Sequence, residues 1–92
     1  MSSTFIAFDF GMTKMGVAIG QNITNTASPL DPMVIRNGSP DWDLVERLIK
    51  EYRPTTIILG KPKVIDESSE TLMKKIKAFK RSLERDFSQN IE

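Results

Sequence analysis

An aspartate within an apolar segment is the residue of this chain best suited to chemistry. Asp9 lies in the segment 6–10, which is otherwise apolar and is predicted to form a buried β-strand. Because an unpaired carboxylate is costly to bury, we expect a cation, a metal ion or N–H donors beside it. Gly11 leaves room for a phosphate or a sugar to approach the backbone. The alternative is that Asp9 caps the following turn by accepting N–H bonds from Thr13 or Lys14.

Basic and aromatic residues suggest contacts with a polyanion. Lys61 and Lys63 follow the apolar segment 55–60, which should run parallel to the strand of Asp9. Both lysines are therefore expected near the carboxylate, where they would meet a phosphate backbone; the alternative is a solvated loop. The lysine-rich face of the last helix would add sequence-independent affinity or serve only as solvated surface. Trp42 could stack a base, but we favour packing at a helix start.

The residue inventory narrows the possible chemistry. The chain has no cysteine and no histidine, which excludes disulfides, thiolate metal sites and the usual general base near neutral pH. Catalysis would therefore rest on carboxylates, lysine, tyrosine, hydroxyl groups or a bound metal ion. The formal net charge of +1 at pH 7 neither favours nor excludes a nucleic-acid partner.

Length and composition predict one small domain, 1–92. Its residues are 39% hydrophobic and 27% charged, as in ordinary globular chains. A chain of this size buries only about 60% of its unfolded surface. No apolar run approaches the roughly 18 residues that a membrane span needs, and the N-terminus does not resemble a signal peptide. We therefore expect a cytoplasmic protein with no membrane association.

Hydrophobic patterning predicts the elements that position these residues. Strands over 4–10 and 15–20, joined by a short turn, form an antiparallel hairpin. The first strand is apolar on both sides and is expected at the centre of a sheet. In the second strand, the alternating small residues Gly16, Ala18 and Gly20 let another group approach one face closely.

An edge strand and a helix are expected next. The segment 33–35 is strand-like, and two prolines before it suit an edge strand with irregular pairing. Ser39 can cap the helix and Pro40 suits its first position. Pro54 then ends the helix.

A parallel strand and a long helix complete the chain. The strand-like segment 33–35, the first helix and the strand 55–60 follow one another at a spacing that implies a right-handed parallel crossover. The second helix, capped by Ser68 or Ser69, runs to about Phe87. The order β-β-β-α-β-α predicts an α/β fold with a mixed sheet, and the chain ends where a further strand would be expected.

The hairpin around Asp9 is compatible with two kinds of site. Actin-like ATPases and sugar kinases have a closely similar Asp-Gly hairpin as their first phosphate loop. RNase H-like nucleases use an aspartate of the first strand to hold a divalent metal ion. ATP-binding members of the first group need several hundred residues and a second domain, which 92 residues cannot supply. An ATP-binding half-site is therefore the less favoured alternative.

The wider sequence resembles the bacterial YqgF/RuvX family, described as pre-16S rRNA nucleases or Holliday junction resolvases. The resemblance is collinear from about Thr4 to Ile91. Its motifs are, in order, Asp9-Phe10-Gly11 with Gly16-Val17-Ala18, Thr26-Ala27-x-Pro29-Leu30, Asp41-Trp42, the helix end from Leu48 to Pro54, Gly60-x-Pro62, and Leu72. The order and spacing of the whole set carry the resemblance.

This resemblance implies an RNase H-like fold and metal-dependent phosphodiester hydrolysis on structured RNA or branched DNA, with 16S rRNA maturation favoured. Asp9 matches the family's first metal-binding carboxylate, which holds Mg²⁺ or Mn²⁺ together with a Glu on the next strand and an Asp on a later helix. Those partners should lie beyond Glu92, so the chain looks like the N-terminal two-thirds of an RNase H-like domain. Lys14, Lys61 and Lys63 are then the candidate nucleic-acid contacts.

Two expectations concern these 92 residues alone. Catalysis should be absent or very weak, because one carboxylate cannot hold two metal ions. The alternative to an enzyme is a non-catalytic fragment that binds nucleic acid or self-associates. An open sheet edge, where the next strand would lie, favours a homodimer formed by strand pairing.

Overall fold

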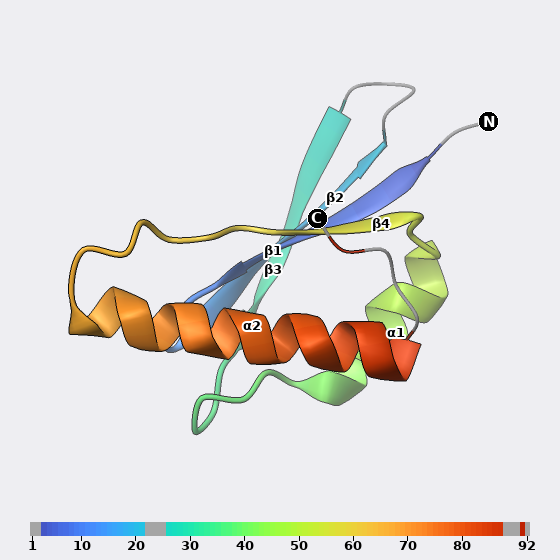
Figure 1. The fold of residues 1–92 in the computed structure, drawn as a ribbon. Helices are drawn as coiled ribbons and strands as arrows, with labels where there is room; N and C mark the ends of the chain where they lie inside the picture. The colour runs from blue at the N-terminus through green and yellow to red at the C-terminus, as the bar shows by residue number, and fades with distance from the viewer. Residues whose placement is uncertain (1–2, 22–25, 88–90, 92) are drawn as a thin grey trace.

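A mixed four-stranded sheet and two helices make up the computed structural model, which describes residues 3–21, 26–87 and 91 (Figure 1). The strands are β1 (Thr4–Phe10), β2 (Lys14–Gln21), β3 (Thr26–Val34) and β4 (Thr56–Leu59), and the helices are α1 (Trp42–Tyr52) and α2 (Glu67–Phe87). The spatial order is β3-β2-β1-β4, with β1 antiparallel to β2 and parallel to β4. The predicted order of elements and the central position of the first strand are confirmed.

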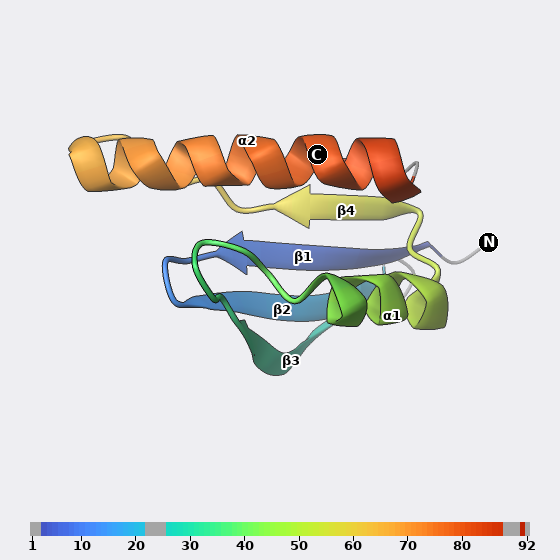
Figure 2. The same ribbon diagram turned by 90° about the horizontal axis from the view of Figure 1, so that it is seen from below.

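Alternation along β1 gives the sheet one covered face and one open face. Ile6, Phe8 and Phe10 are buried, whereas Asp9 between them is exposed. Both helices pack on the face of the buried residues, and no described helix lies on the other face (Figure 2). The expectation that Asp9 is buried is therefore wrong. A carboxylate on the open face keeps its hydration and needs no buried partner.

The core lies between the covered face and the two helices. Val45, Leu48 and Ile49 of α1 are buried at the i, i+3, i+4 spacing of an amphipathic helix. Phe79 is the central aromatic residue of α2, with its ring centroid 5.2 Å from that of Trp42. Trp42 therefore packs at the start of α1, as favoured from the sequence.

The two helix caps differ from the predicted ones. Asp41 caps α1, where its carboxylate accepts the Leu44 N–H at 3.2 Å. Ser39 instead exchanges two backbone hydrogen bonds with Arg36 across a tight turn that ends before the helix cap, and its hydroxyl donates to the Pro40 carbonyl at 3.4 Å.

The cap of α2 is reciprocal. The Asp66 carboxylate accepts the Ser69 N–H at 2.8 Å, and the Ser69 hydroxyl accepts the Asp66 N–H at 3.1 Å. The hydrogen bonds from Ser69, the backbone N–H first, lower the pKa of Asp66. Asp66 therefore takes the capping role predicted for Ser68 or Ser69, while Ser69 occupies the third helical position of a capping box.

The outer strands of the sheet have different edges. β3 pairs along β2 with an irregularity between Met15 and Val17, so the expected irregular edge strand is confirmed and is longer than predicted. At the opposite edge, Ile91 forms an isolated parallel bridge with Ile57 of β4. Because β1 occupies the inner side of β4, Ile91 pairs with the outer side. None of the helices in the described ranges is long and apolar enough to cross a membrane.

Candidate active site on the open sheet face

Asp9 lies between two glycines of the neighbouring strands. Gly16 is its antiparallel partner on β2. Gly60 follows β4 directly, and its N–H donates to the Phe8 carbonyl at 3.0 Å. A Cβ built on Gly16 would lie 3.5 Å from the Asp9 Cβ, and a Cβ built on Gly60 would lie 3.2 Å from the Asp9 Oδ1. The carboxylate thus has a glycine backbone on each side.

A shallow hollow of about 360 Å³ surrounds this carboxylate on the open face. Asp9 supplies its only ionisable side chain, and the remaining lining residues are Ala7, Phe8, Gly16, Val17, Ala18, Ile58 and Gly60. Within the described residues, no hydrogen bond or ion pair involves the Asp9 carboxylate. A negatively charged group in an otherwise neutral hollow favours a cation as its ligand.

The turn after Asp9 does not use this carboxylate as a cap. The Gly11 N–H donates to the Lys14 carbonyl at 3.0 Å, so backbone groups close the turn. A Cβ on Gly11 would lie 2.5 Å from that same carbonyl oxygen. Gly11 is therefore required by the turn itself, rather than by an approaching phosphate.

The small residues of β2 also differ in their roles. The ring of Phe5 lies over Gly20, in the space that a Cβ would need. Gly16 and Ala18 instead line the hollow beside Asp9. The group that lies close to Gly20 is thus the ring of Phe5. The surface beside Gly16 and Ala18 stays open and belongs to the hollow at Asp9.

The predicted basic residues do not line this hollow. Lys14 begins β2 and is exposed, as are Lys61 and Lys63. Lys61 lines a separate hollow of about 390 Å³ together with Lys77 and Lys80 of α2. Strand register explains this arrangement: Phe8 pairs with Leu59, so the next residues, Asp9 and Gly60, lie side by side and Lys61 points away. Gly60 is thus the neighbour that sequence reasoning missed, although the expected parallel pairing contained the signal.

The carboxylate of Asp9 is the right type of ligand for a hard cation, but one carboxylate is too few to form a metal site. Carboxylate oxygens are the ligands that Mg²⁺ and Mn²⁺ prefer. Across residues 3–21, 26–87 and 91, no group of three acidic side chains could hold a metal ion. Asp9 therefore offers one ligand, and the described chain places no second carboxylate beside it.

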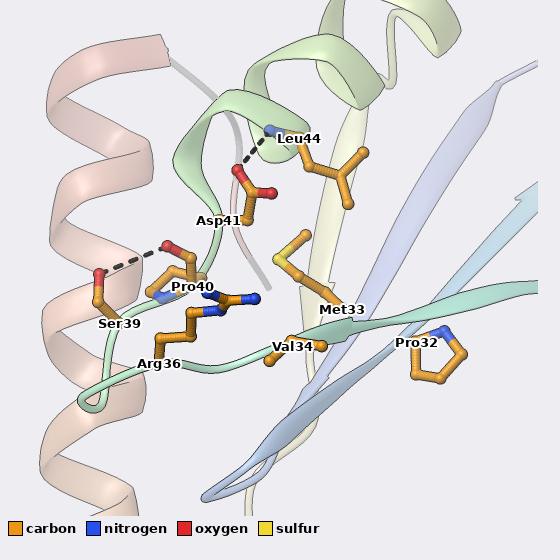
Figure 3. Close-up of a pocket in the computed structure, with 8 residues that line it drawn as sticks. All are labelled: Pro32, Met33, Val34, Arg36, Ser39, Pro40, Asp41 and Leu44. Carbon is orange, nitrogen blue, oxygen red and sulfur yellow. Dashed lines mark hydrogen bonds between the residues drawn. The ribbon is translucent and has the colours of Figure 1, made fainter.

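A wider hollow of about 650 Å³ lies between β3 and α1 (Figure 3). It is lined by Pro32, Met33, Val34, Arg36, Ser39, Pro40, Asp41 and Leu44. Its carboxylate, on Asp41, is engaged by the Leu44 N–H at the helix start, as the dashed line shows. Because that group serves as a helix cap, this hollow is less suited to chemistry than the one at Asp9.

Comparisons with known proteins agree on one family. The model of the RuvX family, described as Holliday junction resolvase, matches residues 3–92. Proteins of Escherichia coli O139:H28 and Escherichia fergusonii, both named "Putative pre-16S rRNA nuclease", are 47% identical to the chain over 79 residues. The match covers 86% of this chain and 57% of each relative, so the chain spans little more than half of their length.

A solved structure supports the fold independently. T. thermophilus RuvC in complex with a Holliday junction substrate superposes with a TM-score of 0.61 at 12% sequence identity. The alignment covers 96% of this chain and 63% of RuvC. The expected RNase H-like α/β fold is thereby confirmed.

Proposed function

Because this chain belongs to the RuvX family of Holliday junction resolvases, we propose that it forms the Asp9-bearing part of a nuclease. Its reaction is hydrolysis of phosphodiester bonds in structured nucleic acid, with pre-16S rRNA as the favoured substrate. One observation carries this proposal: the Asp9 carboxylate is exposed and unpaired in an otherwise uncharged hollow on the open sheet face.

The proposed role of Asp9 is to be one ligand of a divalent metal ion. When bound, Mg²⁺ or Mn²⁺ supplies Lewis-acid chemistry, activating water and stabilising the developing charge on a phosphate. The apolar lining contributed by Ala7 and Ile58 leaves this carboxylate without a competing cation. Asp9 therefore stays free to act as a ligand.

The lysine group of Lys61, Lys77 and Lys80 is the proposed contact with the nucleic-acid backbone. These three side chains line one hollow, and no acidic side chain lines it with them. Phosphates would displace the counterions that such a cluster holds, which gives affinity without sequence selection. Binding should therefore be sensitive to salt and tolerant of sequence.

The 92-residue chain is proposed to bind substrate but to cleave it very weakly. One carboxylate is too few for the pair of metal ions that this chemistry uses. In this proposal, residues 1–92 supply Asp9 and the lysine group. The other carboxylates of the active site are not among these residues.

Binding and cleavage can be tested together with a hairpin RNA and a four-way DNA junction. We expect fluorescence anisotropy to detect binding that weakens steeply between 50 and 200 mM salt, as phosphate contacts require. With Mn²⁺, cleavage should be at or near background, and any excess should disappear in Asp9→Asn. The absence of binding at low salt, or cleavage that survives Asp9→Asn, would contradict the proposal.

A further inference from the structure

A third hollow, of about 300 Å³, lies between the segment 38–42 and α2, at the end of β1. Its apolar lining is aromatic: Phe10 and Phe79 are buried, and Trp42 is half-buried. This volume is at the lower end of the range for ligand pockets and suits one planar ring system. Unlike the hollow at Asp9, this one therefore offers aromatic surface against which a ligand can stack.

The core holds these rings in place before any ligand binds. The ring centroid of Phe79 lies 5.2 Å from that of Trp42 and 5.6 Å from that of Phe10. Trp42 also stacks on Phe87, with centroids 6.3 Å apart and an interplanar angle of 16°. Packing at the start of α1 thus fixes the indole without covering all of it. A ligand would meet an ordered surface, which keeps the entropic cost of binding low.

Lys75 brings a positive charge to this hollow and has no counter-ion there. It is half-buried, and among the residues that the structure describes it forms no ion pair and no hydrogen bond. Its ammonium group occupies the space that a Cβ on Gly38 would need. Gly38 has a φ of 75° in a tight turn, a conformation that favours glycine. The turn therefore leaves room for an unpaired cation beside the aromatic rings.

The charge of the hollow is complementary to an anion. No acidic residue is among the described residues that line it, and Ser82 adds a hydroxyl that can donate or accept. One stripe of α2 forms this side at helical spacing, through Lys75, Ala78, Phe79 and Ser82. The lysine group lines a different hollow with other residues of α2. This site is therefore separate from the proposed contact with the nucleic-acid backbone.

We propose that this hollow binds the base of one unpaired nucleotide, with Lys75 beside an adjoining phosphate. The inference rests on the proposed function and names its substrate class: structured nucleic acid that carries an unpaired nucleotide. A base in a duplex is stacked on its neighbours, whereas an unpaired base can be splayed out and stacked on aromatic side chains. Every base has a π-face, so such stacking tolerates any sequence. A nucleotide is favoured over an acidic peptide because it carries a planar ring and an anion in one unit.

This binding is independent of the hollow at Asp9. Asp9 and Phe10 are consecutive residues of β1, so their side chains point to opposite faces of the sheet. The aromatic hollow has no carboxylate and needs no metal ion. Binding can therefore be measured in EDTA, where cleavage does not interfere.

The experiment uses Trp42, the one tryptophan of the chain, as a reporter inside the hollow. The 92-residue chain is titrated in EDTA with three labelled RNA hairpins of the same stem. One is fully paired, one has a single bulged adenosine, and one has an abasic site in place of that adenosine. We expect the bulged adenosine to quench Trp42 fluorescence and to bind at least about fivefold more tightly than the other two. This is the lower end of the effect of stacking one base on an aromatic side chain.

Lys75→Gln tests the phosphate contact. It should weaken binding of the bulged hairpin and lower the slope of log affinity against log salt by about one. Lys74→Gln is the matched control, because it removes the same charge from the next residue of α2, which is exposed and does not line the hollow. Lys75→Arg keeps the charge and should keep the affinity of the unchanged chain. Equal effects of Lys75→Gln and Lys74→Gln would overturn the role of Lys75.

The outcomes separate this inference from the proposed function. If all three hairpins bind alike by fluorescence anisotropy and leave Trp42 fluorescence unchanged, the inference is overturned while nucleic-acid binding stands. If the abasic hairpin binds as tightly as the bulged one, the hollow takes no base, which also overturns it. If no hairpin binds at low salt, the proposed function fails and the inference falls with it. Stronger quenching by a peptide of glutamates with one phenylalanine would assign the hollow to a protein partner instead.

Discussion

The ring of Phe8 on β1 meets the ring of Phe79 on α2 edge to face, with centroids 5.4 Å apart and an interplanar angle of 89°. Phe8 precedes Asp9 and points to the opposite side of the strand. The contact therefore holds β1 against α2 on the covered face of the sheet and leaves the Asp9 carboxylate free on the open face.

Removing this contact should be costly. We expect Phe79→Ala to lower the free energy of unfolding by about 3 to 5 kcal/mol, because it leaves a cavity among Phe8, Phe10 and Trp42. Urea denaturation followed by circular dichroism measures the loss. The control is Lys74→Ala on an exposed position of α2, which should change stability by no more than about 0.5 kcal/mol. Equal stability of the two variants would contradict this account of the core.

The cap of α2 should make stability depend on pH. The pKa of Asp66 is lowered in the folded chain, mainly by the Ser69 N–H, so its stabilisation is present above the ordinary value of 3.8. It is lost as the pH falls through the lowered folded-state pKa. We expect Asp66→Ala to melt at a lower temperature than the unchanged chain near neutral pH, with the difference shrinking in acid. Asp31→Ala, an exposed aspartate of β3, is the control; a pH-independent deficit in Asp66→Ala would refute the prediction.

Asp9 should contribute chemistry rather than stability. Its carboxylate is exposed and has no hydrogen-bond or ion-pair partner within the described chain. Asp9→Asn should therefore change the free energy of unfolding by no more than about 0.5 kcal/mol. Because the lysine group lines a different hollow, RNA affinity should also be unchanged. A large loss of stability, measured by thermal unfolding, would show that this carboxylate supports the fold.

The lysine group should act through phosphate contacts. Replacing Lys61, Lys77 or Lys80 by glutamine should weaken nucleic-acid binding for all sequences and lower the slope of log affinity against log salt by about one each. Lys50→Gln is the matched control, because Lys50 lies on α1 and pairs with Glu46 at 2.7 Å. If the control reduces the slope as much as the group variants do, binding has no preferred surface.

Much of the fold could be predicted from the sequence because its signals are local. Two-residue alternation and helical periodicity, together with Pro54 and Gly60, marked the elements in their correct order. The caps were harder to predict. Ser39 is a good cap in isolation, but a tight turn pairs its backbone with Arg36 and shifts the helix start to Asp41.

The candidate site could be predicted only in part. Asp9 could be identified from the sequence as a carboxylate in a strand next to a glycine turn. Whether its side chain is exposed could not be predicted, because an apolar strand does not reveal which face of the sheet the helices will cover. Lys61 was expected beside Asp9. In the structure Gly60, one residue earlier, lies there, and Lys61 lies with the lysines of α2.

The prolines of β3 restrict how copies of this molecule can associate. Pro29 and Pro32 have no N–H, so they interrupt the row of donors along one edge of the sheet. A strand of another molecule that paired with this edge would lack hydrogen bonds at those two positions. The β3 edge is therefore a poor template for the strand of another molecule.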